Sequence, residues 1–325
     1  MGIEYTNYKK LLCIVGPTAT GKTDLALHLA KLYKGELVAC DSRQVYCDLD
    51  LGTGKEAGEN QPFSKHSGYW ILDGIKVWLY DLVPFTKQYT ISDYIKDGTK
   101  AVNSIAGGYK LPIIVGGTGF YLKGLLNGID TDKVPEDSEL RQELEQLSLE
   151  EIQTRLKSLA PDFFNELNNS EKHNQRRLIR RIEVLKYLQS VDVSKEKPQG
   201  ISQKYDVLKI GLTVDKKELD KRIEQRVVKR VEQGMIGESE SLIKKGLTFE
   251  RMRQLGLEYG VIADFLEGVI RTKDEFIFIL QTKIKQFAKR QLTWFKNDSD
   301  IVWFDISDKN YISKVEKKVQ AWYNT

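Results

Sequence analysis

The sequence predicts an α/β fold in which a parallel sheet with flanking helices is interrupted by an all-helical insertion. Short apolar runs alternate with segments of helical spacing up to about residue 130, and this alternation is typical of a parallel sheet with crossover helices. Between Glu139 and Leu188 no strand pattern appears, and an apolar run returns only at Leu208–Leu212. We therefore expect a core at 1–130, a helical insertion at 131–206, and a return to the core with C-terminal helices at 207–325.

The first half of the chain predicts strands and helices in turn. The apolar run Leu11–Val15 ends in a Gly-Pro turn and indicates a buried strand, and the leucine spacing of Thr23–Tyr33 indicates a helix. A second strand is expected at Glu36–Ala39, ending before Asp41. The same criteria predict strands at Ile75–Leu79 and Ile113–Val115 and a helix at Ile91–Ile105.

The second half is mostly helical in pattern. Leucines and isoleucines at helical spacing run through 139–188, and the polar stretch 191–206 predicts a loop. After the strand at Leu208–Leu212, helices are expected at 216–245, 251–267 and 273–296. A late strand at Ile301–Phe304 and a terminal helix at 309–323 complete the prediction.

Composition favours a soluble globular protein of the cytosol. Of the 325 residues, 41% are hydrophobic and 30% are charged, and no apolar run approaches the roughly 18 residues of a membrane span. The net charge of +4 is too small to indicate nucleic acid by itself, so that case depends on local clusters. The three cysteines have no zinc or disulfide spacing, which favours a reducing compartment.

A complete phosphate-binding motif lies between the first predicted strand and helix. It fits G-x-x-x-x-G-K-[ST] and comprises Gly16, Pro17, Thr18, Ala19, Thr20, Gly21, Lys22 and Thr23. Its glycines let backbone amides surround an anion, the helix N-terminus adds a favourable dipole, and Lys22 adds a point charge. The hydroxyl of Thr23 is a candidate Mg²⁺ ligand. The core is thus expected to be P-loop NTPase-like, and the bound polyphosphate need not be ATP.

Asp41 follows the second predicted strand, and its residue type alone leaves three roles open. It is suited to bind a metal ion as in ATPases and kinases, to act as a general base beside the phosphate loop, or to cap a turn without chemistry. The carboxyl ends of strands in open α/β sheets form the ligand site, so both chemical roles fit this place.

Further motifs extend the pattern along nearly the whole chain. Asp41-Ser-Arg-Gln-Val-Tyr46, Leu51-Gly-Thr-Gly-Lys55 and Pro112–Tyr121 follow the P-loop, and Gln175–Arg180, Arg222-Ile-x-x-Arg226 and Phe287–Phe295 follow later. In this order, from about 16 to 295, they resemble the tRNA dimethylallyltransferase (tRNA isopentenyltransferase) family. That resemblance implies transfer of a dimethylallyl group from dimethylallyl diphosphate to the exocyclic amine of the adenosine beside the anticodon of tRNA.

The resemblance also implies roles for single residues. Asp41 is expected to accept the proton of the adenine amine, while Lys22, Thr23 with Mg²⁺, and an arginine stabilise the departing diphosphate. Arg222 and Arg226 share one helix face and are both candidates, with Arg222 slightly preferred. The target base is expected to flip out of the anticodon loop to reach Asp41.

Contacts with the anticodon stem-loop are expected from three regions. Two of them are basic clusters, which RNA phosphates require but which solvated helix faces also show. The expected contacts are Asp41, Ser42, Arg43, Gln44 and Thr118 near the site, Arg141, Gln175, Arg176, Arg177, Leu178, Ile179 and Arg180 in the insertion, and Lys289 and Arg290 near the C-terminus. We expect a monomer, because one chain supplies every motif.

Two other enzyme classes remain as alternatives. A small-molecule kinase would use Lys22, Thr23 and Asp41 for ATP and Mg²⁺, and an adenylate prenyltransferase would accept a free nucleotide. The long basic insertion favours tRNA over a small acceptor. The chain also departs from the family where Leu255–Tyr259 replaces an IGY(K/R)E-like stretch and where Lys285 replaces an arginine, and 56–76 matches no pattern.

Overall fold

The computed structural model describes residues 9–55, 62–129, 134–190 and 199–325, and these divide into two compact units. The first unit combines the chain up to Asn127 with the chain from Gly200 onward, and the second is 128–199. The predicted boundary at 131 and residues 191–198 of the polar stretch lie outside the described residues. Residues 201–206 belong to the first unit, because Ile201–Lys204 forms a short 3₁₀ helix and Tyr205 pairs with Lys9 in the sheet.

The described strands of the first unit form one eight-stranded sheet in the order β3-β4-β5-β2-β6-β1-β7-β8. The strands from β5 to β8 in this order are parallel, whereas β3 and β4 are antiparallel. This architecture confirms the predicted α/β fold. The strands are β1 Lys9–Val15, β2 Glu36–Cys40, β3 Phe63–His66, β4 Tyr69–Leu72, β5 Ile75–Trp78, β6 Pro112–Gly116, β7 Tyr205–Thr213 and β8 Ile301–Asp305.

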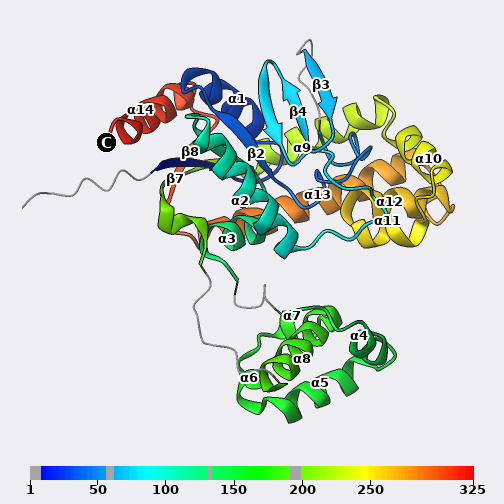
Figure 1. The fold of residues 1–325 in the computed structure, drawn as a ribbon. Coiled ribbons are helices and arrows are strands. Elements are labelled where there is room, and N and C mark those ends of the chain that lie inside the picture. Colours follow the sequence, from blue (N-terminus) through cyan, green and yellow to red (C-terminus); the bar gives the residue numbers. More distant parts are fainter. Residues whose placement is uncertain (1–8, 56–61, 130–133, 191–198) are drawn as a thin grey trace, which may run out of the picture. The chain divides into compact units, whose positions relative to one another are not determined.

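The central strands are continuous apolar runs because helices cover both of their faces. Helix α1 (Lys22–Leu32) connects β1 to β2, and α2 (Ile91–Gly107) connects β5 to β6, which is a step in the opposite direction across the sheet. Right-handed crossovers in opposite directions place their helices on opposite faces. Figure 1 shows this arrangement, with the terminal helix α14 (Tyr311–Tyr323) ending beside α1, where Tyr33 and Tyr323 have ring centroids 4.9 Å apart.

The parallel arrangement brings the carboxyl ends of four strands to one edge of the sheet. Gly16 follows β1, Asp41 follows β2, Gly117 follows β6 and Val214 follows β7. Ligands of open α/β sheets bind outside these ends, at the point where the chain turns to either side of the sheet. The fold therefore gathers the motifs that lie far apart in the sequence.

Strands β3 and β4 are the two strands that the sequence did not predict. They form an antiparallel hairpin in which Phe63 pairs with Leu72 and His66 with Tyr69. All four residues of β3 are exposed, so its sequence Phe-Ser-Lys-His has no apolar alternation. An exposed edge strand gives no hydrophobic period, which explains the miss at β3. Strand β4 is a half-buried apolar run that the prediction did not include.

A layer of helices precedes β8 and continues the first unit. The helices predicted at 216–245 and 251–267 are each divided in two, at Gly234 with φ 101° and at Gly256 with φ 73°. A left-handed residue ends a helix, and glycine adopts that conformation without steric cost. The helices are α9 Lys216–Glu232, α10 Met235–Lys244, α11 Phe249–Leu255, α12 Leu257–Leu266 and α13 Lys273–Lys296, and α3 at Gly119–Asn127 precedes the second unit.

The second unit is helical in every element that is described. Its hydrophobic core is built mainly by residues from α5 and α8, with Ile152, Leu156, Leu178 and Ile182 among the most buried. The helices are α4 Ser138–Glu145, α5 Leu149–Leu159, α6 Pro161–Glu166, α7 Asn169–Lys172 and α8 Gln175–Ser190. Across all described ranges, no helix combines the length and the apolar character needed to cross a membrane.

Candidate active site

The P-loop turns from β1 into α1 through two glycines in left-handed conformation. Gly16 has φ 139°, and a Cβ at this position would lie 2.4 Å from the backbone oxygen of Leu212. Gly21 has φ 76° and immediately precedes α1. Both positions exclude a side chain on conformational or steric grounds, so the glycines of the motif are required by the turn itself. The hydroxyl of Thr20 donates to the carbonyl oxygen of Pro17 at 2.9 Å and closes the loop.

Lys22 extends across the loop. Its ammonium donates to the carbonyl oxygen of Pro17 at 2.7 Å. Burial, with the neighbouring Arg226 guanidinium, lowers the pKa of Lys22 to about 7, and Asp41 acts in the opposite direction. Crowded cations in a buried site favour an anion between them, because a diphosphate would offset their mutual repulsion.

Asp41 is fixed by the turn that follows β2. Its carboxylate accepts a hydrogen bond from the backbone amide of Arg43 at 2.9 Å. The backbone amide of Ser42 donates to the Thr118 hydroxyl at 3.2 Å, and the Thr118 amide donates to the carbonyl oxygen of Cys40 at 3.1 Å. These contacts join the ends of β2 and β6, so the side chain of Asp41 is presented at a rigid edge of the sheet.

Gln291 on α13 joins the P-loop to the turn after β6. Its side-chain oxygen accepts from the Thr18 amide at 2.9 Å, and its nitrogen donates to the carbonyl oxygen of Gly117 at 3.0 Å. The side chain is 6% exposed. A Cβ on Gly117 would lie 2.0 Å from the Gln291 nitrogen, so this close approach requires glycine.

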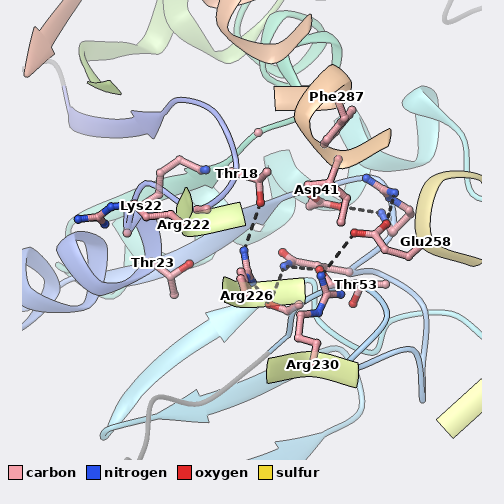
Figure 2. Close-up of a pocket in the computed structure, with 18 of the residues that line it drawn as sticks. Thr18, Lys22, Thr23, Asp41, Thr53, Arg222, Arg226, Arg230, Glu258 and Phe287 are labelled. Carbon is pink, nitrogen blue, oxygen red and sulfur yellow. Dashed lines mark hydrogen bonds and ion pairs between the residues drawn. The ribbon is translucent and has the colours of Figure 1, made fainter. Parts of the chain in front are cut away.

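Two arginines of α9 face the P-loop. Arg226 donates to the Thr18 hydroxyl at 3.2 Å and to the carbonyl oxygen of Gly54 at 3.4 Å. Arg222, one turn earlier, donates to Glu218 at 2.8 Å, and its side chain is 41% exposed. Figure 2 shows Arg222 beside Lys22 and Arg226 between Thr18 and the loop that carries Thr53.

A buried ion-pair network forms the opposite wall of the site. Glu258 accepts from Arg43 at 2.8 Å and lies 3.5 Å from Arg230. The Arg43 guanidinium also lies 5.1 Å from the ring centroid of Phe287. Glu258 stands in the stretch that departs from the family pattern, and its carboxylate offsets the charge of Arg43 and lies within ion-pair distance of Arg230.

These groups line one cavity of about 620 Å³. It brings together most of the predicted catalytic and phosphate-binding residues with three of those predicted to bind tRNA, Asp41, Arg43 and Gln44. Among the predicted residues, the lining contains Thr18, Ala19, Gly21, Lys22, Thr23, Asp41, Arg43, Gln44, Arg222 and Arg226. Gly16, Pro17, Thr20, Ser42, Thr118, Lys289 and Arg290 are not part of it.

Comparison with known proteins identifies the family. The IPP transferase family model matches residues 44–298, and the isopentenyl transferase model matches residues 9–73. The "tRNA dimethylallyltransferase 2" of Treponema denticola is 38% identical over 299 residues, which cover 89% of this chain and 94% of the relative. The chain belongs to the tRNA dimethylallyltransferase family.

Other members of the family agree over almost the whole chain. The tRNA dimethylallyltransferase of Streptococcus uberis is 36% identical and covers 98% of this chain and 97% of its own. The crystal structure of the tRNA isopentenylpyrophosphate transferase from Bacillus halodurans has a TM-score of 0.68 at 29% identity, with 96% of both chains covered. A eukaryotic dimethylallyltransferase acting on tRNA, at 23% identity and a TM-score of 0.75, supports the fold.

In the helical unit of this family member, part of the predicted tRNA contact set has internal partners. Arg141 donates to Glu183 through two nitrogens at 2.7 and 2.9 Å, and Arg180 donates to the same carboxylate at 3.2 Å. Leu178 and Ile179 are buried in the core of the unit. These contacts give the four side chains a structural role, because they hold α8 to α4 and to the segment before it.

The remaining residues of the predicted set are more accessible. Arg176 and Arg177 are exposed on α8, and Gln175 is partly exposed. Lys289 and Arg290 are exposed on α13, where the Arg290 guanidinium lies 5.8 Å from the ring centroid of Phe287. Such positions leave the charges available for phosphate groups.

Several residues of the site were not singled out from the sequence. Gln291 lies inside the predicted Phe287–Phe295 motif, so its place in that motif was the available signal. Glu258 and Arg230 carry no motif, and only three-dimensional packing brings them to the cavity beside Thr53 and Gly54.

Proposed function

We propose that this chain transfers a dimethylallyl group from dimethylallyl diphosphate to the exocyclic amine of the adenosine adjacent to the anticodon in tRNA. The observation that carries the proposal is the meeting of the P-loop, the carboxylate of Asp41 and the two α9 arginines around one cavity. A family of tRNA dimethylallyltransferases that matches almost the whole chain supports the same reaction. The chain is accordingly an enzyme, a transferase that modifies tRNA.

The acceptor amine needs a base. The lone pair of an exocyclic adenine amine is delocalised into the ring, so the group is a weak nucleophile until its proton is removed. We assign this proton to Asp41, whose carboxylate is oriented by the Arg43 amide and lines the cavity. A bond forms from the amine nitrogen to the prenyl carbon, the bond from that carbon to the diphosphate oxygen breaks, and the amine proton moves to Asp41.

The leaving diphosphate needs positive charge. We assign its binding to the P-loop, with Lys22 and Arg226 on either side. Of the two arginines, we assign the closer contact with the diphosphate to Arg226, because it already contacts the Thr18 hydroxyl of the P-loop. Arg222 lines the same cavity and is assigned to the outer phosphate oxygens.

The donor set also fits Mg²⁺. This ion keeps several waters and binds proteins through one or two oxygen ligands together with substrate phosphates. Thr23 and Asp41 supply a hydroxyl and a carboxylate to the same cavity as the P-loop. Thr23 would hold Mg²⁺, which when bound supplies charge neutralisation for the diphosphate.

The tRNA partner is assigned to residues around the site and to the helical unit. Ser42, Arg43, Gln44 and Thr118 are proposed to contact the flipped base and its neighbours, and Gln175, Arg176, Arg177, Lys289 and Arg290 are proposed to contact the backbone of the anticodon stem-loop. We propose that a monomer suffices, because one chain lines the cavity, and that it works in the cytosol.

A transfer assay with competing acceptors tests the proposal. The purified chain is incubated with Mg²⁺, radiolabelled dimethylallyl diphosphate, and unmodified tRNA, AMP or ATP. We expect label on tRNA. Label on AMP would identify an adenylate prenyltransferase instead, and ATP turnover without label on any acceptor would identify a kinase.

A further inference from the structure

A short loop forms the wall of the cavity opposite the P-loop. We call Leu49–Lys55 the glycine loop, after Gly52 and Gly54. Thr53 and Gly54 line the cavity, and Figure 2 shows Thr53 between Arg226 and Arg230. The loop is tightly turned, since the amide of Lys55 donates to the carbonyl oxygen of Asp50 at 3.0 Å and the amide of Gly54 to that of Leu51 at 3.3 Å.

One carboxylate from outside the motifs holds the back of this loop. Glu238 on α10 accepts hydrogen bonds from three consecutive amides, those of Asp50 at 3.1 Å, Leu51 at 2.7 Å and Gly52 at 3.0 Å. Tyr259 donates its hydroxyl to the same carboxylate at 3.0 Å. Successive amides that point inward form a concave anion site, and here the anion is a side chain of the protein itself.

The packing around this contact leaves little freedom. Tyr259 is fully buried, and a Cβ on Gly52 would lie 2.2 Å from its hydroxyl oxygen. Four hydrogen bonds to a charged acceptor contribute more stabilisation than four hydrogen bonds between neutral groups. The conformation of the glycine loop therefore depends on the charge of Glu238.

The front of the loop orients the side chains that face the substrates. The carbonyl oxygen of Leu51 accepts from Arg230 at 2.5 Å, and that of Gly54 accepts from Arg226 at 3.4 Å. The carbonyl oxygen of Thr53 accepts from the side-chain amide of Gln44 at 3.4 Å. Arg226 belongs to the diphosphate side of the cavity and Gln44 to the adenosine side, so one loop touches both.

We propose that Glu238 is a positioning residue for the transfer reaction. It fixes the positions of the Arg226 and Gln44 side chains through the backbone of the glycine loop. The inference rests on the proposed function, and it assigns to a residue remote from the reacting atoms the task of aligning both substrates. Glu238 itself touches neither substrate. Its effect passes from the amides of 50–52 to the carbonyl groups of Thr53 and Gly54.

Replacing the charge while keeping the shape isolates this effect. In Glu238→Gln the side-chain nitrogen is a donor that faces backbone donors, so at least one of the amides loses its acceptor. A displaced loop misplaces Arg226 and Gln44, and errors of this kind lower rates by roughly 10- to 100-fold. We expect kcat/KM to fall by that factor, with a higher KM for dimethylallyl diphosphate and for tRNA.

The matched control is Glu240→Gln, an exposed carboxylate on the same helix. Both variants and the wild type are assayed for label transfer to tRNA, and active concentration and melting temperature are measured for each. A merely structural role of Glu238 would lower the melting temperature and the active fraction but leave both KM values unchanged. Wild-type KM values in Glu238→Gln would overturn the proposal, provided that the wild type transfers label. An inactive wild type would instead count against the proposed function.

A double-mutant cycle with Gln44→Ala tests the route of the effect. If Glu238 acts through Gln44, the effect of Glu238→Gln on the KM for tRNA shrinks once Gln44 is truncated, because the two changes remove the same alignment. Additive effects on that KM would contradict the proposed route, whatever the stability of the variants.

Discussion

Asp41 is the residue to which we assign the role of the base. The hydrogen bond from the backbone amide of Arg43, at 2.9 Å, fixes the orientation of the Asp41 carboxylate at the end of β2. Asp41→Asn keeps the size of the side chain but removes the base. Since general-base catalysis contributes roughly 10²- to 10⁴-fold, we expect the single-turnover rate with tRNA to fall by that factor. The KM for dimethylallyl diphosphate should change little, and a rate within a few-fold of the wild type would contradict the assigned role.

We expect Lys22 to make diphosphate binding depend on pH. Burial with the neighbouring Arg226 lowers the pKa of Lys22 to about 7 in the free protein, and a bound diphosphate stabilises the charged form. Binding above pH 7 therefore takes up a proton, and affinity falls as pH rises, by up to about tenfold per pH unit for one proton.

The matched variant for this test is Lys22→Arg, whose charge does not titrate in the same range. Isothermal titration calorimetry with inorganic diphosphate between pH 6 and 9, chosen as roughly centred on the pKa, measures both proteins. Ionisation of the ligand is common to the two, so their difference reports Lys22. Parallel pH profiles would show that the residue remains charged throughout.

The P-loop and Asp41 could be predicted from the sequence, because each lies in a local motif whose residues are neighbours in the chain. The sequence also predicted Arg222 and Arg226, which lie four residues apart on one helix. It did not single out Gln291 or Glu258, whose partners Thr18 and Arg43 are far away in the chain. Contacts of this kind arise from the packing of α13 and α12 against the sheet edge, and no local pattern encodes them.

At the scale of elements, two glycines with different surroundings give a paired prediction. Gly117→Ala places a Cβ 2.0 Å from the Gln291 nitrogen, so the side chain that joins the P-loop to the turn after β6 must move. We expect a higher KM for dimethylallyl diphosphate. Gly237 in α10 has no atom within 4 Å of an added Cβ, so Gly237→Ala should stabilise the helix by about 0.5–1 kcal/mol.

Steady-state kinetics and thermal unfolding separate these two outcomes. Gly237→Ala should raise the melting temperature at unchanged KM. Unchanged kinetics in Gly117→Ala would mean that the contact between Gln291 and Gly117 does not shape the phosphate site.

The order of most strands and helices could be predicted from the hydrophobic periodicity of the sequence. The elements that this prediction missed were missed for identifiable physical reasons. The central strands are apolar along their whole length because helices cover both faces, so they were recognisable from composition. Strand β3 was missed because it is exposed at the edge. The breaks at Gly234 and Gly256 were missed because glycine inside a helical pattern signals a break only when its φ is positive, which the sequence does not show.

At the scale of the whole molecule, we propose that the helical unit supplies charge for the RNA. Arg141 and Arg180 are engaged with Glu183, whereas Arg176 and Arg177 are exposed on α8. Replacing Arg176 and Arg177 by alanine should weaken tRNA binding. The slope of log Kd against log salt concentration should fall by about one to two, because each neutralised phosphate releases counterions.

Fluorescence anisotropy with labelled tRNA over a series of salt concentrations measures this slope. Lys157→Ala, an exposed cation on α5 of the same unit, is the matched control. An equal loss of slope per removed charge in the control and in the arginine variant would show that the unit binds by its net charge and that α8 has no special part.

The identity of the acceptor atom tests the central claim most directly. Wild-type protein is given radiolabelled dimethylallyl diphosphate with two tRNAs that differ only in adenosine or guanosine beside the anticodon, and the products are digested to nucleosides. The account predicts label on the exocyclic amine of that adenosine, none on the guanosine variant, and labelling in the Asp41→Asn reaction that is slower by roughly 10²- to 10⁴-fold. Label on both tRNAs, or on free AMP in preference to tRNA, would contradict it.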